Sequence, residues 1–174
     1  MEATSTRIEK EPSVPAAFLT GVLLIAFDAF VLNQGAISVL VIAWALIIRL
    51  PFIMFRDKYK TTRKKQLVCQ GIYIGAAVLV LVANHLNNRL AQHRGEVVVS
   101  AIYAFHSAHQ RYPNTLEELV PEQLPKVPVA KYAFGFNTFW YAPDESNTMF
   151  FYVWFPPFGR TGYSFRRRAW FDFD

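Results

Sequence analysis

Two histidines, His106 and His109, stand three residues apart in a stretch predicted to be helical. That spacing can bring two imidazoles to one metal ion. At about 100° per residue, however, His109 falls on the side of Phe105 whereas His106 points away, and no nearby Cys, Asp or Glu completes a ligand set. We therefore favour a buried or interfacial role for both histidines over a metal site of an enzyme.

Other catalytic patterns are missing from the sequence. It contains no serine at a nucleophile turn, no phosphate-binding glycine loop and no paired carboxylates. We therefore expect a protein without enzymatic activity, catalytic residues or a cofactor. The single cysteine, Cys69, lies in an apolar segment, so the outer part must be held together by packing and not by a disulfide.

Asp28 is an ionisable residue near the middle of the first apolar segment. A carboxyl group in a bilayer is costly and marks a functional position by default. It could pair with a cation of a partner subunit or line a proton path, or it could be protonated and bonded within the bundle to Asn33, Gln34 or Gln70. Partner contact and structural bonding are favoured, because one carboxylate without other intramembrane charges makes a poor transporter.

A short basic loop separates two long apolar runs. It holds six of the eighteen Lys and Arg residues against one Asp, so its balance of +5 equals the net charge of the chain. The positive-inside rule places such a loop in the cytoplasm, where each cation near anionic lipid headgroups contributes roughly 1 kcal/mol. The six residues are Arg56, Lys58, Lys60, Arg63, Lys64 and Lys65.

The apolar segments on either side of this loop predict three membrane spans. Residues 14–55 form a helical hairpin, the loop covers 56–66, and a third span covers 67–83. Each approaches the ~20 residues that a bilayer core requires. Residues 1–13 are then cytoplasmic, and residues 84–174 form a domain on the other side. That domain carries nine basic and eight acidic residues, which gives no electrostatic footprint for nucleic acid.

The third span contains Gly71 and Gly75, followed by Ala76 and Ala77. Small residues four apart allow another helix to approach closely in lipid. This face packs either against an integral membrane partner or second copy, or against the protein's own hairpin.

The third helix is predicted to continue beyond the membrane as an amphipathic stem to residue 110, with Gly95 as a place where it could bend. Asn114 and Glu117 match a capping box for a short helix that ends at Pro121. Aromatic runs at 138–142, 148–155 and 162–173 then predict an antiparallel meander with one face on the stem. The fold class is an α+β membrane protein.

The aromatic strands also predict an interaction surface. One face of the second strand carries Phe150, Tyr152 and Trp154, and the third strand carries Arg166 and Arg168. A single helix covers only one face of a small sheet, and exposed Tyr, Trp and Arg anchor interfaces. Alternatively, strand ends, loops and the membrane surface cover these side chains.

The outer part resembles the type IV pilin fold, and in particular the heads of type II secretion pseudopilins. The resemblance covers residues 67–174, and its most specific part is the segment 110–121 with the Leu-Pro and Val-Pro pairs at 124–125 and 127–128. It implies a pilin-like head in the periplasm of a bacterial inner-membrane protein. The prepilin processing site and the glutamate that pilins carry near the start of the mature helix are missing from residues 67–73, and two extra spans precede them, which argues against filament assembly.

The leading hypothesis is a non-enzymatic inner-membrane accessory or scaffold subunit that docks onto a larger assembly through its helices and its aromatic head. The alternative from another class is a periplasmic binding or sensing module for a glycan or a hydrophobic small molecule.

Overall fold

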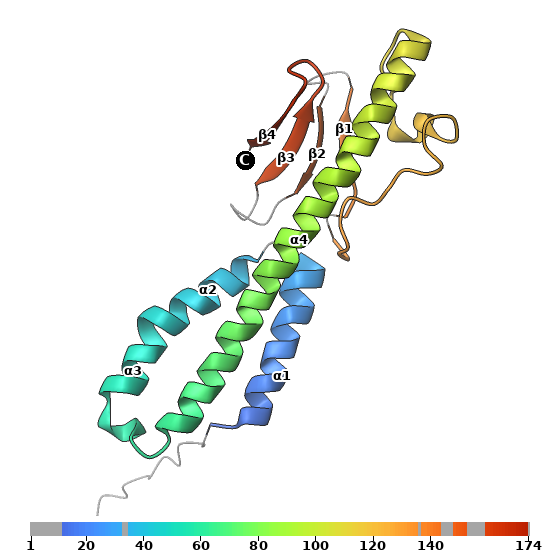
Figure 1. Ribbon diagram of the computed structural model, residues 1–174. Helices are drawn as coiled ribbons and strands as arrows, with labels where there is room; N and C mark the ends of the chain where they lie inside the picture. The colour runs from blue at the N-terminus through green and yellow to red at the C-terminus, as the bar shows by residue number, and fades with distance from the viewer. Residues whose placement is uncertain (1–11, 33–34, 136, 144–147, 153–158, 174) are drawn as a thin grey trace, which may run out of the picture.

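The computed structural model describes residues 12–32, 35–135, 137–143, 148–152 and 159–173. Three long helices lie at one end and a small antiparallel sheet packs against the far half of the third helix (Figure 1). All three helices are long and apolar enough to cross a membrane. The predicted combination of apolar helices with a small antiparallel sheet is confirmed, and it is compatible with an α+β membrane protein.

The first two helices, which we call the hairpin, each pack against the third helix, and they contact one another mainly where the first ends and the second begins (Figure 1). One consists of α1 (Val14–Leu24) and the π-helical η1 (Ile25–Leu32). The other consists of α2 (Ala36–Trp44), the π-helical η2 (Ala45–Arg49) and α3 (Leu50–Phe55). Pro51 has no N–H to donate to the preceding turn, and the widened η2 segment lies immediately before α3. The missing donor of Pro51 thus coincides with a π-helical turn.

The third helix, α4 (Arg63–His109), follows the short η3 (Asp57–Tyr59) and has 47 residues. At 1.5 Å per residue it is about 70 Å long. The helix continues through Gly95 without a break. A Cβ at this position would lie 2.7 Å from Cη2 of Trp170, so the absence of a side chain makes room for the tryptophan ring. Gly95 is thus a packing notch and not a bend. The helix ends where Gln110 adopts a left-handed conformation and donates to the His106 carbonyl at 2.9 Å.

Small side chains hold the hairpin against α4. A Cβ on Gly21 would lie 3.3 Å from the Cβ of Ala76, so α1 and α4 approach closely at this point. We call the three helices up to residue 86 the bundle, and α4 from residue 91 onward with the sheet the head. The buried small residues of the bundle are Ala17, Gly21, Ala29, Ser38, Ala45, Ala76 and Ala77.

The sheet is a four-stranded antiparallel meander in the order β1 (Trp140–Ala142), β2 (Thr148–Tyr152), β3 (Arg160–Ser164), β4 (Ala169–Phe173). The single strand predicted over 162–173 is wrong: β3 and β4 form a hairpin in which Ser164 pairs with Ala169. The alternation of side chains continued through the turn, and no Gly or Pro marked it. Arg168 supplies the turn by adopting a left-handed conformation with φ 53°.

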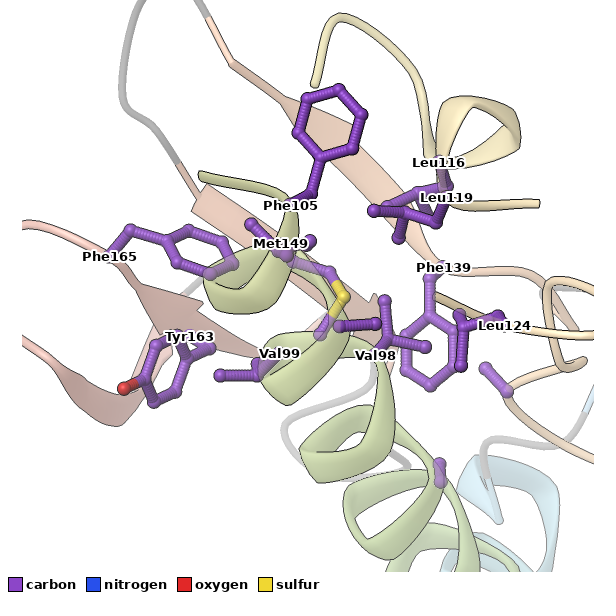
Figure 2. Packing of buried hydrophobic residues seen from close by; sticks show 14 residues of the cluster. Val98, Val99, Phe105, Leu116, Leu119, Leu124, Phe139, Met149, Tyr163 and Phe165 are labelled. Atoms are coloured by element: carbon purple, nitrogen blue, oxygen red, sulfur yellow. The ribbon is translucent and has the colours of Figure 1, made fainter. Parts of the chain in front are cut away.

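The head has a core of larger side chains between α4, the sheet and the short η4 (Leu116–Leu119). Figure 2 shows Met149 of the sheet between Val98 and Val99 of α4, with Leu119 and Phe139 nearby. The cap before η4 differs from the predicted capping box, because the Asn114 N–H bonds to the carboxylate of Glu118, one residue beyond Glu117, at 3.1 Å. The 3₁₀ geometry of η4 has a tighter turn than the α-helix that the capping-box pattern assumes.

Candidate interaction surfaces and cavities

Asp28 is fully buried, and its partner is Ser38, which the sequence did not indicate. Its Oδ2 accepts hydrogen bonds from the Ser38 N–H at 2.8 Å and from the Ser38 hydroxyl at 2.6 Å. Ser38 lies in the first turn of α2, where backbone N–H groups have no intrahelical acceptor. Asp28 therefore caps the second helix from the first, and residues 33 and 34 lie outside the described part of the chain.

Gly71 and Gly75 lie on the exposed side of α4, and a Cβ at either would meet nothing within 4 Å. Ala76 and Ala77, by contrast, are buried on the side that faces the hairpin. The glycine pair therefore does not pack against the protein's own hairpin. It forms an open face with Val68, Val78 and Val82, which are also exposed.

The described cations of the basic loop differ in their surroundings. Arg63 folds back and donates from Nε to the Ile53 carbonyl at 3.2 Å, and Arg56 lies over the Phe52 ring at 4.8 Å. Lys60 forms an exposed ion pair with Asp57 at 2.8 Å. Lys64 and Lys65 are exposed, and the side chain of Lys58 lies outside the described residues.

The two candidate metal ligands have separate neighbours. The His109 ring stacks on Phe105 with centroids 4.2 Å apart, and its Nδ1 lies 3.1 Å from the Phe105 carbonyl oxygen. His106 lies against Tyr112, with ring centroids 4.3 Å apart. Within the described ranges, no three His, Cys, Asp or Glu side chains come together as a metal site would require.

The predicted aromatic surface is placed only in part. Phe150 and Tyr152 lie in β2, but their side chains are outside the described residues, as is Trp154 altogether. Arg166 and Arg168 are exposed in the β3–β4 turn, together with Arg167, and not along a strand face. Three adjacent cations thus project from the end of the head that lies farthest from the hairpin (Figure 1).

Beside this arginine turn lies a pair of tyrosines, of which Tyr163 is buried and Tyr103 is half-buried. The hydroxyl groups of Tyr103 and Tyr163 are 3.2 Å apart. Burial first, and then the hydrogen bond with Tyr163, raise the pKa of Tyr103 to about 12. The Tyr103 hydroxyl is therefore neutral at ordinary pH.

The loop 129–135 joins the head to the bundle, and no local pattern in the sequence indicated this contact. Asn87 of α4 holds the backbone of Tyr132 by two hydrogen bonds, of 2.9 and 3.2 Å. The Phe134 N–H donates to the Phe30 carbonyl at the end of η1 at 2.7 Å. Lys131 in this loop is 2% exposed, and burial lowers its pKa to about 7. The loop thus ties the outer end of the hairpin to the base of the head.

Below this loop, a cavity of about 260 Å³ separates η1 from α4. Its lining is mostly apolar and includes Phe30, Leu86, Leu90 and Asn84. The Asn84 amide is buried, and neither of its polar atoms has a hydrogen-bond partner in the described part of the chain.

A second, more polar cavity of about 420 Å³ lies between α4 and β4. Trp170 and Asp172 line it from the strand, and Asn88, Arg89 and Gln92 line it from the helix. Asp172 accepts a hydrogen bond from the Thr161 hydroxyl at 2.6 Å, which fixes its carboxylate. An aromatic ring beside amide, guanidinium and carboxylate groups can hold a polyhydroxylated ligand.

Known proteins give no further assignment of these surfaces. Comparison of the chain with protein-family models, with curated proteins and with solved structures finds no match. The pilin-like relationship therefore stays a prediction from the sequence.

Proposed function

We propose that this protein is a non-enzymatic membrane subunit that docks onto an integral membrane partner or a second copy through the open glycine face of α4. The observation that carries the proposal is the combination of Gly71 and Gly75 with empty space in front of both. Helices associate in lipid by close packing at small residues, and this chain's own hairpin uses the opposite side of the helix, at Ala76 and Ala77.

The continuity of α4 supports a scaffold role. One helix of 47 residues runs from the basic loop to the core of the head. The loop 129–135 adds a second connection, through its bonds to Asn87 and Phe30. A partner held in the bilayer would thereby be positioned relative to a partner held by the head.

The proposed location is the bacterial inner membrane, with the basic loop and the N-terminus in the cytoplasm and a pilin-like head in the periplasm. The charge of the loop supports this orientation. A long helix packed on an antiparallel meander supports the pilin-like head. A reporter fused after Asp174 tests the orientation: a phosphatase that requires the periplasm is expected to be active there, and activity of a cytosolic reporter instead would reverse the topology.

Site-specific photo-crosslinking in native membranes tests the docking face. A photo-reactive residue at Val78, which is 46% exposed beside the glycines, is expected to give one discrete adduct. The same residue at Leu19, 61% exposed on α1, is the matched control and is expected to give only lipid adducts. Substitution of both Gly71 and Gly75 by Leu should abolish the Val78 adduct without unfolding the protein. Equal protein adducts from the probes at Val78 and Leu19 would contradict the proposal. Recovery of only the uncrosslinked monomer with both probes would also contradict it.

The cavity between α4 and β4 favours a second candidate function, the binding of a glycan by the head. Short oligosaccharides should then change the tryptophan fluorescence, and the change should disappear on Trp170→Phe. Trp140→Phe is the control, because Trp140 is 55% exposed on β1 and does not line the cavity. A fluorescence change that survives Trp170→Phe would reject this site.

A further inference from the structure

A third cavity, of about 330 Å³, lies between the helices of the bundle at the end near the basic loop. Its lining includes Trp44, Arg49, Gln66, Gln70 and Tyr73. It thus combines one cation and two amides with two amphipathic aromatic rings. None of these residues belongs to the glycine face, and the site is independent of the scaffold role, since it needs only that the three helices cross a bilayer.

Arg49 brings a positive charge to this cavity. Its guanidinium donates to Gln66 Oε1 at 3.0 Å and to the Tyr59 hydroxyl at 3.4 Å, and lies 5.5 Å from the centre of the Tyr59 ring. These two bonds leave further N–H donors of the guanidinium available. In the ranges that the structure describes, no carboxylate pairs with Arg49.

Gln70 provides the second, independent observation. The residue is 3% exposed, and its amide nitrogen Nε2 is buried without a hydrogen-bond partner among the described residues. Buried amide groups almost always have a partner. Because Gln70 lines the cavity, an acceptor atom of a molecule bound there would supply the missing bond after a small movement of the side chain.

The two donors lie at different depths. Gln66, which holds the guanidinium, is in the first turn of α4, and Gln70 is one helical turn further from the basic loop. In a bilayer, the phosphate of a lipid lies outside its ester carbonyls, and the acyl chains lie inside both. The vertical order of Arg49 and Gln70 matches the order of phosphate and ester carbonyl.

We propose that this cavity binds one anionic diacyl phospholipid. Its phosphate accepts charge-assisted hydrogen bonds from Arg49, and an ester carbonyl accepts a hydrogen bond from Gln70 Nε2. Trp44, which is 47% exposed, lies beside the part of the acyl chains that is nearest to the ester groups. Free phosphate would satisfy Arg49 alone, so the position of Gln70 favours a lipid as the source of the phosphate.

Native mass spectrometry of the full-length protein in detergent tests the site, with phosphatidylglycerol as the added probe. The wild type is expected to retain one lipid. Arg49→Gln should reduce the occupancy about tenfold, the scale of one charge-assisted hydrogen bond, and Gln70→Leu several-fold. Lys64→Gln, at an exposed position of the same loop, is the control and should leave the occupancy unchanged.

Two further measurements identify the ligand. Phosphatidylglycerol with brominated acyl chains should quench the fluorescence of Trp44 in a variant that has no other tryptophan, and inorganic phosphate in excess should not displace it. Gln70→Leu serves if Arg49→Gln fails to fold, because it removes no side-chain hydrogen bond found among the described residues. Equal losses in Lys64→Gln and Arg49→Gln would show diffuse attraction to the loop and overturn the proposal. Displacement by inorganic phosphate would overturn the lipid as ligand.

Discussion

The bundle and the head differ in the side chains that they bury. In the bundle most buried residues are small, as at Ala17, Gly21 and Ala76, although Ile53 and Val80 are also fully buried, whereas Phe18, at 65% exposure, and many other large apolar residues face outward. In the head, large residues such as Ile102 and Met149 are fully buried. A part surrounded by water must hide its large apolar groups, whereas lipid gives no hydrophobic reason to hide them and close packing decides the contacts.

The polar groups differ in the same way. In the bundle they are turned inward, as in the pair Asp28 and Ser38 and in the cavity with Arg49 and Gln70. In the head most charges are exposed, and the arginines at 166–168 project from a turn. Lys131, at 2% exposure, is the exception, and it lies in the loop that connects the two parts.

The largest expected effect comes from truncating the core of the head. Ile102→Ala removes a fully buried side chain and should lower the free energy of unfolding by about 2–5 kcal/mol. Leu79→Ala, on the same helix but 60% exposed in the bundle, should change it by less than about 1 kcal/mol. Thermal unfolding of both variants in the same detergent measures the difference, and equal losses would mean that the bundle is packed like the head.

The next effect concerns Lys131. Because its pKa is lowered to about 7 by burial, the unfolded chain binds a proton between about pH 7 and 10 that the folded head does not. Stability should therefore rise as the pH increases through this window. Lys131→Met should remove that rise and stabilise the protein at pH 7, by a few kcal/mol at ~1.4 kcal/mol per pH unit between the two pKa values.

Unfolding temperatures of the wild type and Lys131→Met at pH 7 and pH 9.5 check this prediction. Both pH values lie below 10.0, the ordinary pKa of tyrosine. Above that pH the raised pKa of Tyr103 should make the stability fall as the pH increases. A parallel pH dependence in both proteins would contradict it.

Close packing in the bundle is tested at Gly21. Gly21→Val places a branched side chain where even a Cβ would lie 3.3 Å from Ala76 and 3.5 Å from Ile72, and overpacking of this kind costs about 1–3 kcal/mol. Gly75→Val is the matched control, because nothing lies within 4 Å of its added Cβ. Unfolding temperatures in detergent compare the two, and equal behaviour would refute the close approach of α1 and α4.

The smallest effect is expected at Gly95. In the head this glycine makes room for the Trp170 ring, whereas Gly21 of the bundle allows two helices to approach. In Gly95→Ala, the gain of about 1 kcal/mol in helix propensity opposes the contact of the new Cβ with the Trp170 ring at 2.7 Å. We expect a net loss of about 1 kcal/mol and a changed near-UV circular dichroism signal. Combining it with Trp170→Phe, which removes the contacting ring atoms, should recover the loss in a double-mutant cycle; additive effects would refute the contact.

Local patterns predicted much of the fold. The apolar segment 14–55 indicated the two hairpin helices, and the amphipathic pattern beyond the third span indicated the continuation of α4 into the head. The hairpin between β3 and β4 was missed, because the alternation of side chains persisted across it and its left-handed residue is Arg168 and not glycine. Periodicity reports the local state of the chain but not where a strand reverses without a turn residue.

The candidate sites were predictable as residue types but not as partners. Asp28 was recognised as unusual, yet Ser38 was not expected, and the glycine face was identified without its direction. The cavity of Arg49 and Gln70 and the loop 129–135 were found only in the structure. Each of them joins residues from separate helices or from a helix and a distant loop.

Hydropathy, charge and side-chain period depend on neighbours along the chain, so they were enough to locate the helical and apolar segments, the cluster of cations and the order of the strands. The three-dimensional packing was needed to learn which side of α4 faces the hairpin, which groups contact Asp28 and Arg49, and which glycines have another side chain packed against them. The rotation of each helix about its axis results from the sum of all contacts across the bundle and the head, and no local stretch of sequence contains that sum.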